Sequence, residues 1–258
     1  MEALKRHRVV DRAKRLSVLI WRGFNQLLWP AVCGTCNAAI CDTDDDLCPK
    51  CWGELLTCTA GDYCPRCGRD ASRYGLVGGA CAACRNEQTH FDGIARAGVY
   101  ADALQRMILA LKHDRSELAV TLAPLAEAAL QGSSFHDDID LFVPVPLHWT
   151  RRLLRGYNQS GLIAGRLHHP QARISTNLVR ARRTRIQPQM PTPAARARNV
   201  AGAFIVRDGH DFDGKKICIV DDIKTSGATL NECAKTLKEA GAVKVYALVL
   251  AVAGQKTA

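Results

Sequence analysis

Four pairs of cysteines, each pair separated by two residues, have the spacing that points most clearly to chemistry. In chain order they are Cys33/Cys36, Cys48/Cys51, Cys64/Cys67 and Cys81/Cys84. Two thiolates on one tight turn can bind a single metal ion, and a second pair completes a tetrahedral site. The pairs therefore predict two four-cysteine sites, built either from consecutive pairs or from interleaved ones.

Zinc is the metal that this spacing favours, and redox-active dithiols or an iron–sulfur cluster are the alternative interpretations. Four sulfur ligands leave no coordination position for water, so we expect the zinc to be structural. Disulfides are disfavoured because the apolar stretch at 16–21 is too short for a secretory signal, and we expect a cytoplasmic protein. Cys41 and Cys58 lie outside the pairs, while Cys218 and Cys233 are expected to be buried hydrophobic residues.

A second informative group follows an apolar run near the carboxyl end of the chain. Residues 217–229 read ICIVDDIKTSGAT, which predicts a strand, two carboxylates (Asp221 and Asp222), a turn and the start of a helix. Free backbone N–H groups at the helix start and the hydroxyls of the turn would bind a phosphate. The adjacent carboxylates could accept hydrogen bonds from sugar hydroxyls. An ordinary Ser/Thr helix cap accounts for the hydroxyls alone, and the pattern of a Walker loop is absent.

The segment at 141–207 contains no Asp, Glu or Lys but has twelve arginines. They are Arg151, Arg152, Arg155, Arg166, Arg173, Arg180, Arg182, Arg183, Arg185, Arg196, Arg198 and Arg207. The whole chain has a formal charge of +10, so the rest of it is slightly acidic. Because the guanidinium fork matches phosphate oxygens, this segment predicts phosphate-bearing partners. A solvated basic surface is the plainer alternative, although such surfaces usually mix Lys with Glu.

The 258 residues, 47% apolar and 23% charged, have the composition of a globular protein. We expect an amphipathic helix at 1–30, a double zinc-ribbon domain at 31–90 and an α/β domain at 91–258. The first helix is expected to dock on its own protein, with a membrane-surface helix or a transit peptide as alternatives. The longest uncharged apolar run, 245–253, is too short to span a membrane.

Strands and helices are expected to alternate along the α/β domain, which predicts a parallel sheet flanked by helices. Strands are predicted at 94–100, 141–145, 216–221 and 243–252, and helices at 103–111, 117–130, 158–167 and 229–240. The segment 180–199, with three prolines, is expected to be an exposed mobile loop.

The acid pair and its turn resemble the signature of the phosphoribosyltransferase family, in which such acids precede a T-x-G-x-T-like loop. The resemblance implies a phosphoribosyl pyrophosphate site with Mg²⁺. The ribose and 5′-phosphate would be bound by Asp221, Asp222, Lys224, Thr225, Ser226, Gly227, Ala228 and Thr229. Arg151, Arg152 and Arg155, which follow Val143-Pro144-Val145-Pro146, would help to bind the pyrophosphate or a nucleic-acid phosphate. The loop at 180–199 could close over the site, and no catalytic residue is assigned.

Further motifs narrow the resemblance to the ComF family over residues 27–252. These are Leu27-Leu28-Trp29-Pro30, Ala110-Leu111-Lys112, Pro144-Val145-Pro146-Leu147, Arg155-Gly156-Tyr157-Asn158-Gln159 and Arg198-Asn199-Val200-Ala201-Gly202-Ala203-Phe204. The resemblance implies a phosphoribosyltransferase-like α/β fold, preceded by a small four-cysteine zinc-ribbon domain. It also implies a role in natural competence, in the handling of incoming single-stranded DNA.

Two hypotheses follow from these patterns. In the first, the protein binds nucleic-acid phosphates with its arginines. Trp149 and Tyr157 would then stack on bases; the alternative is that they are half-buried aromatic residues beside a strand end. In the second, it is an active phosphoribosyltransferase on an unidentified acceptor. The expected partners are phosphoribosyl pyrophosphate or a related phosphate ligand, single-stranded DNA, and competence or recombination proteins.

Overall fold

The computed structural model describes residues 32–40, 46–113, 115–184 and 192–254. These form two compact units, residues 1–53 and 54–258. The first contains the first four paired cysteines, and the helix predicted at 1–30 lies outside its described residues. Helix α2 (Pro49–Thr59) begins in the first unit and ends in the second. None of the described helices is long and apolar enough to cross a membrane.

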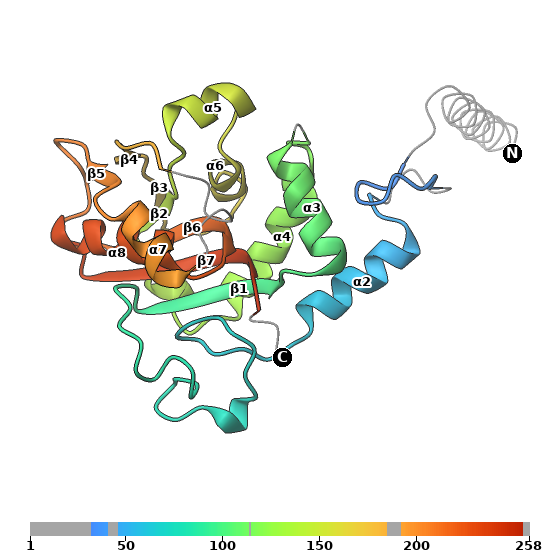
Figure 1. Ribbon diagram of the computed structural model, residues 1–258, viewed down its shortest axis with the longest axis horizontal. Helices are drawn as coiled ribbons and strands as arrows, with labels where there is room; N and C mark the ends of the chain where they lie inside the picture. Colours follow the sequence, from blue (N-terminus) through green and yellow to red (C-terminus); the bar gives the residue numbers. More distant parts are fainter. Residues whose placement is uncertain (1–31, 41–45, 114, 185–191, 255–258) are drawn as a thin grey trace, which may run out of the picture. The chain divides into compact units, whose positions relative to one another are not determined.

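The second unit is built on a five-stranded sheet in the order β1-β7-β6-β2-β3, with every neighbouring pair parallel (Figure 1). The strands are β1 (Gly93–Val99), β2 (Leu141–Pro144), β3 (Arg173–Ile174), β6 (Lys216–Lys224) and β7 (Lys244–Val252). The four predicted strands are confirmed. Their near-continuous apolar runs are typical of parallel strands that are buried on both faces.

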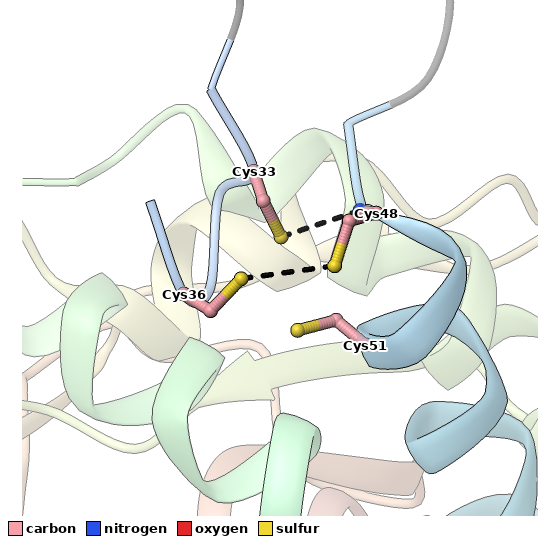
Figure 2. A group of neighbouring side chains, drawn as sticks. All are labelled: Cys33, Cys36, Cys48 and Cys51. Carbon is pink, nitrogen blue, oxygen red and sulfur yellow. Dashed lines mark hydrogen bonds between the residues drawn. The ribbon is translucent and has the colours of Figure 1, made fainter. Parts of the chain in front are cut away.

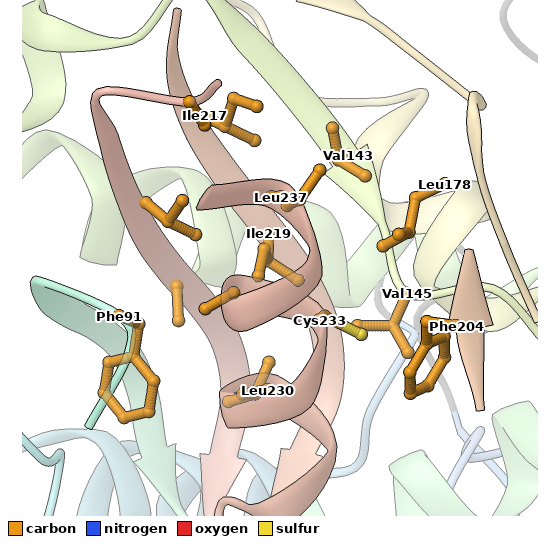
Figure 3. Packing of buried hydrophobic residues seen from close by; sticks show 14 of the residues in the cluster. Phe91, Val143, Val145, Leu178, Phe204, Ile217, Ile219, Leu230, Cys233 and Leu237 are labelled. Atoms are coloured by element: carbon orange, nitrogen blue, oxygen red, sulfur yellow. The ribbon is translucent and has the colours of Figure 1, made fainter. Parts of the chain in front are cut away.

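The helices of this unit connect and cover the sheet. They are α3 (Asp102–Lys112), α4 (Leu118–Gln131), α5 (Trp149–Arg155), α6 (Gln159–Ala164), α7 (Pro193–Val200) and α8 (Ala228–Glu239). Figure 3 shows α8 lying over β6, where Leu230, Cys233 and Leu237 pack with Ile217 and Ile219. Cys218 and Cys233 are fully buried, as predicted.

The strands are all parallel, but the order in which the chain adds them across the sheet reverses between β2 and β6. From β1 the chain passes through α3 and α4 to β2, and then through α5 and α6 to β3. From β6 it passes through α8 back to β7, in the opposite direction. Right-handed crossovers therefore place α4 and α6 on one face and α8 on the other. Open parallel sheets bind ligands outside the carboxyl ends of the strands at such a reversal.

The second group of paired cysteines belongs to the same compact unit as the sheet and docks on β1. Ile94 N–H donates to the Pro65 carbonyl at 2.8 Å, and Arg96, only 4% exposed, donates to the Gly68 carbonyl at 2.7 Å. Gly68 has a φ of +75°, and a Cβ there would lie 3.0 Å from Val252 Cγ2. Glycine is required at this position both by the backbone conformation and by the close approach to the sheet.

The expectation of a loop throughout 180–199 is wrong for the residues that the structure describes. Arg180 ends β4 (Leu178–Arg180), which pairs with β5 (Phe204–Val206) in an antiparallel ribbon. Helix α7 begins at Pro193 because Thr192 caps it, accepting a hydrogen bond from Ala195 N–H at 3.1 Å. Proline suits the first turn of a helix, so Pro193 starts this element. Residues 185–191 lie outside the described part, and the predicted lid remains a prediction.

Candidate functional site

The first group of cysteines converges on one point between the turn at 33–36 and the start of helix α2. Figure 2 shows the sulfurs of Cys33, Cys36, Cys48 and Cys51 directed toward one another. Cys36 Sγ and Cys48 Sγ are 3.7 Å apart, and Cys48 N–H donates to Cys33 Sγ at 3.3 Å. Burial disfavours the Cys33 thiolate, but backbone hydrogen bonds, chiefly from Cys48, outweigh it and lower the pKa of Cys33 to about 6.

The second group repeats this arrangement. Cys64 Sγ lies 3.6 Å from Cys84 Sγ, Cys67 Sγ lies 3.7 Å from Cys81 Sγ, and Cys81 N–H donates to Cys64 Sγ at 3.3 Å. Burial again disfavours the thiolate, yet backbone hydrogen bonds led by Cys81 lower the pKa of Cys64 to about 7.

Both groups fit zinc. With Zn–S bonds of about 2.3 Å, the sulfurs of a tetrahedral site are about 3.8 Å apart, close to the spacings seen here. Each site is formed by consecutive pairs, so the interleaved arrangement does not occur. Each would hold a structural ion with no open position. Cys58 joins neither group and donates to the Ala101 carbonyl at 3.4 Å, while Cys41 lies outside the described residues.

The loop predicted to bind phosphate, residues 225–229, runs from the carboxyl end of β6 into the first turn of α8, and we call it the phosphate loop. Gly227 has a φ of +80°, and α8 begins immediately after it. Ala228 N–H donates to Ser226 Oγ at 3.4 Å. Residues 223–230 and Asp221 line a cavity of about 20 Å³, room for roughly one small group such as a phosphate oxygen or a water.

The acid pair, Asp221 and Asp222, lies at the carboxyl end of β6, and the two acids have different surroundings. Asp221 accepts hydrogen bonds from Ser160 Oγ and from Asp222 N–H, both at 3.0 Å. Burial, followed by the negative charge of Asp222, raises the pKa of Asp221 to about 7. Asp222 forms an ion pair of 3.1 Å with the Lys112 ammonium.

Lys112 and Ser160 are therefore site residues that sequence reasoning did not assign. Lys112 stands in the Ala110-Leu111-Lys112 motif quoted above, but only the topology brings the end of α3 to the acid pair. Ser160 is buried in α6, and nothing in its sequence context marked it.

The three predicted pyrophosphate arginines are placed differently. Arg152 lines a cavity of about 380 Å³ at the carboxyl end of β2, together with Arg180 and Arg207. We call this cavity the arginine groove; its other lining residues are Pro144, Pro146, Leu147, Trp149, Asn158, Thr176, Leu178 and Val179. Arg151 instead donates to the Thr184 carbonyl at 2.9 Å. Burial, then the charges of Arg155 and Arg183, lower the pKa of Arg151. Arg155 is not among the described residues that line the groove.

The acid pair and the arginine groove thus flank the reversal point between β6 and β2, with the phosphate loop beside the acids. This sheet and site define a phosphoribosyltransferase-type domain, and the two cysteine groups define a double zinc ribbon. Family comparison agrees. The double zinc ribbon domain family matches residues 24–85, and the phosphoribosyl transferase domain family matches residues 163–258.

Relatives extend over most of the chain. Competence protein F of Haemophilus influenzae is 26% identical over 226 residues, 85% of this chain and 96% of the relative. The DNA utilization protein YhgH of Salmonella typhimurium is 30% identical over 222 residues, 84% and 94% of the two chains. Competence protein ComFC of Bacillus subtilis is 26% identical over 209 residues, 77% and 80% of the two chains. The chain belongs to the ComF family.

Proposed function

We propose that this protein binds phosphoribosyl pyrophosphate or nucleic-acid phosphates at the carboxyl edge of its sheet, and that it supports the handling of single-stranded DNA in natural transformation. The names of the relatives, a competence protein and a DNA utilization protein, support the process. The acid pair, the phosphate loop and the arginine groove support the binding of phosphate-bearing ligands. Competence or recombination proteins are the macromolecular partners that such a role calls for.

The arginine groove is the observation that carries the proposal. Three arginines line it, and there is no acid among its described lining residues. Two of its buried polar atoms, Asn158 Oδ1 and Arg180 Nε, have no hydrogen-bond partner in the part of the chain that the structure describes. Buried polar atoms are nearly always paired in folded proteins. A bound phosphate group would pair the guanidinium, and a ligand hydroxyl or amine would pair the amide oxygen.

The surroundings of the groove suit a single strand of nucleic acid. Trp149 stands at the groove with 67% of its surface exposed, so its ring is available to stack on a base. Tyr157 is less suited, because its hydroxyl donates to the Leu111 carbonyl at 2.6 Å and holds the ring in place. Arginines track the backbone phosphates without reading sequence, and such binding weakens steeply with salt.

If the ligand is phosphoribosyl pyrophosphate, different residues of this chain would bind its 5′-phosphate, its ribose and its pyrophosphate. The N–H groups of the phosphate loop would hold the 5′-phosphate, and the acid pair would accept hydrogen bonds from the ribose hydroxyls. Lys112 and Ser160 keep the two carboxylates in position. The groove would face the pyrophosphate, and a bound Mg²⁺ would neutralise part of that group's charge.

An active phosphoribosyltransferase is the second candidate, and the intact combination of acid pair and phosphate loop favours it. A reaction through an oxocarbenium-like state could proceed on positioning and charge stabilisation alone. Release of pyrophosphate from phosphoribosyl pyrophosphate, in the presence of an acceptor, would support this function.

The test of the first function is the binding of a fluorescent single-stranded oligonucleotide over a range of salt concentrations. We expect saturable binding that weakens with salt and survives in the Asp221→Asn/Asp222→Asn variant. An affinity that does not change with salt would contradict phosphate contacts. Loss of oligonucleotide binding in the double variant would show that the acid pair, and not the groove, carries the interaction.

A further inference from the structure

A third cavity, of about 690 Å³, adjoins the phosphate loop. Residues 224–228 line both this cavity and the small cavity of about 20 Å³ at the loop. We call the larger one the ribbon cavity, because the second cysteine group and the segment after it form one of its walls. Cys67, Arg69 and residues 87–89 belong to that wall. Helix α7, the first turn of α8 and the two residues after β7, 253–254, form the others. Its volume is in the range of sites for small organic ligands.

The charges of the ribbon cavity favour an anion. Its lining has three cations, Arg69, Arg196 and Lys224, and among the described lining residues Glu87 is the one carboxylate. That carboxylate is already paired with Arg69 at 2.7 Å. Thiolates of the second cysteine group offset part of the remaining charge, since Cys67 also lines the cavity. Arg196 enters from the opposite wall, on α7.

The environment of Lys224 is a second indication of a ligand. The residue is 4% exposed, and its ammonium has no hydrogen bond or ion pair among the described residues. It lies against the phosphate loop, because a Cβ added to Gly227 would be 3.0 Å from Lys224 Cε and 3.6 Å from Nζ. Because Lys224 lines the cavity, a ligand there can reach its ammonium, and no acceptor among the described residues competes for it. An anionic group bound beside the loop would supply that acceptor.

The rest of the lining suits a flat group with polar edges. Phe91, Pro193 and Ala253 contribute apolar surface, while Gln88 and Asn231 contribute amides. Asn231 is held in place, since its Oδ1 accepts from His90 N–H at 2.6 Å. An apolar floor with amides at its edge suits a nucleobase, and the cations beside the loop suit a phosphate.

We propose that the ribbon cavity binds a nucleoside phosphate, with its phosphate toward Lys224 and Arg196 and its base between the second zinc ribbon and helix α7. The second zinc ribbon then forms part of a ligand site in addition to stabilising the fold. This inference rests on the proposed function, because it assigns a ligand class to the space beside the same loop. The ligand is either a free nucleotide or one nucleotide unit of single-stranded DNA.

The experiment measures the binding of deoxyadenosine monophosphate by calorimetry and of a labelled oligodeoxythymidine by anisotropy, both to the full-length zinc-loaded protein. Arg196→Ala removes a cation from the lining. Ala197→Trp fills the cavity from an exposed position of α7 without changing the charge. Arg198→Ala is the matched control, because Arg198 is exposed on the same helix and outside the lining.

We expect both cavity variants to weaken binding of at least one probe by about tenfold or more, and the control to stay within about twofold of wild type for deoxyadenosine monophosphate. Weaker binding of deoxyadenosine monophosphate, with or without weaker binding of the oligonucleotide, identifies a site for a free nucleotide. Weaker binding of the oligonucleotide alone identifies a site for a unit of DNA. Equal affinities of wild type, Arg196→Ala and Ala197→Trp for both probes would overturn the inference. The proposed function fails separately, if wild type binds neither phosphoribosyl pyrophosphate nor the oligonucleotide.

Discussion

Replacing Asp221 by Asn should stabilise the protein while weakening the proposed binding of sugar hydroxyls, and the stabilisation should depend on pH. Asn keeps an oxygen for the Ser160 hydroxyl and the Asp222 N–H, so the two hydrogen bonds at 3.0 Å can remain. What it removes is a carboxylate whose ionisation is opposed first by burial and then by the charge of Asp222.

The magnitude follows from the pKa of Asp221. In the folded state it is raised from 3.8 to about 7, so the folded chain holds this proton more tightly than the unfolded chain. The free energy of unfolding therefore falls as the pH rises from about 4 to about 7, and the full penalty is present above pH 7. This difference in pKa between the folded and unfolded states corresponds to at most about 4 kcal/mol. We therefore expect the free energy of unfolding to increase by about 1–4 kcal/mol in Asp221→Asn at pH 8.

The assay is urea unfolding of wild type and Asp221→Asn at several pH values between 5.5 and 8. The difference in the free energy of unfolding should grow toward pH 8 and shrink toward pH 5.5. Asp222→Asn is the control: it relieves the smaller, charge-related part of the penalty on Asp221 but breaks the ion pair with Lys112, so its gain should be smaller than that of Asp221→Asn. If Asp221→Asn is no more stable than wild type at pH 8, the ionised Asp221 carboxylate does not destabilise the folded protein.

Three further outcomes are expected. Gly227→Ala should weaken binding of phosphoribosyl pyrophosphate at least tenfold by calorimetry, because its φ of +80° and the 3.0 Å approach to Lys224 Cε force the phosphate loop to move. Gly68→Ala should lower the free energy of unfolding by about 1–3 kcal/mol through strain and crowding against Val252, while metal analysis still finds zinc in both ribbons. Arg152→Ala should reduce the slope of log affinity against log salt for an oligonucleotide by about one, and an unchanged slope would place the phosphates elsewhere.

The sequence was sufficient for the parts of the site that depend on local patterns. Cysteine pairs specify tight turns, and the structure groups them two pairs at a time. Uninterrupted apolar runs specified the strands, and the run ending at Asp221 placed the acids at the correct end of β6. The start of α8 followed from Gly227 and the hydroxyl-rich turn.

The residues that were missed come together only through the topology. Lys112 is far from the acid pair along the chain, and the crossover from β1 to β2 brings it there. Arg180 and Arg207 were counted among twelve arginines, but their place in the groove depends on the pairing of β4 with β5. Strands of two or three residues show too little periodicity to be predicted. The short strands β3, β4 and β5 and the short helix α5 were therefore not predicted.

The domain boundaries expected at residues 30 and 90 remain predictions. The structure shows that the second cysteine group shares a compact unit with the sheet, through contacts such as the one between Gly68 and Arg96. No sequence pattern indicated this docking, because Gly68 directly follows the Cys64/Cys67 pair and nothing near it marks a contact with the sheet.

Calorimetric titration of phosphoribosyl pyrophosphate with Mg²⁺ into the zinc-loaded protein shows directly whether the protein has a ribosyl-phosphate site. We expect saturable binding in wild type and its loss in the Asp221→Asn/Asp222→Asn variant, with the variant still folded. Equal binding by the variant would contradict the role given to the acid pair. Absence of binding in wild type would contradict a working ribosyl-phosphate site and leave the arginine groove to account for the function.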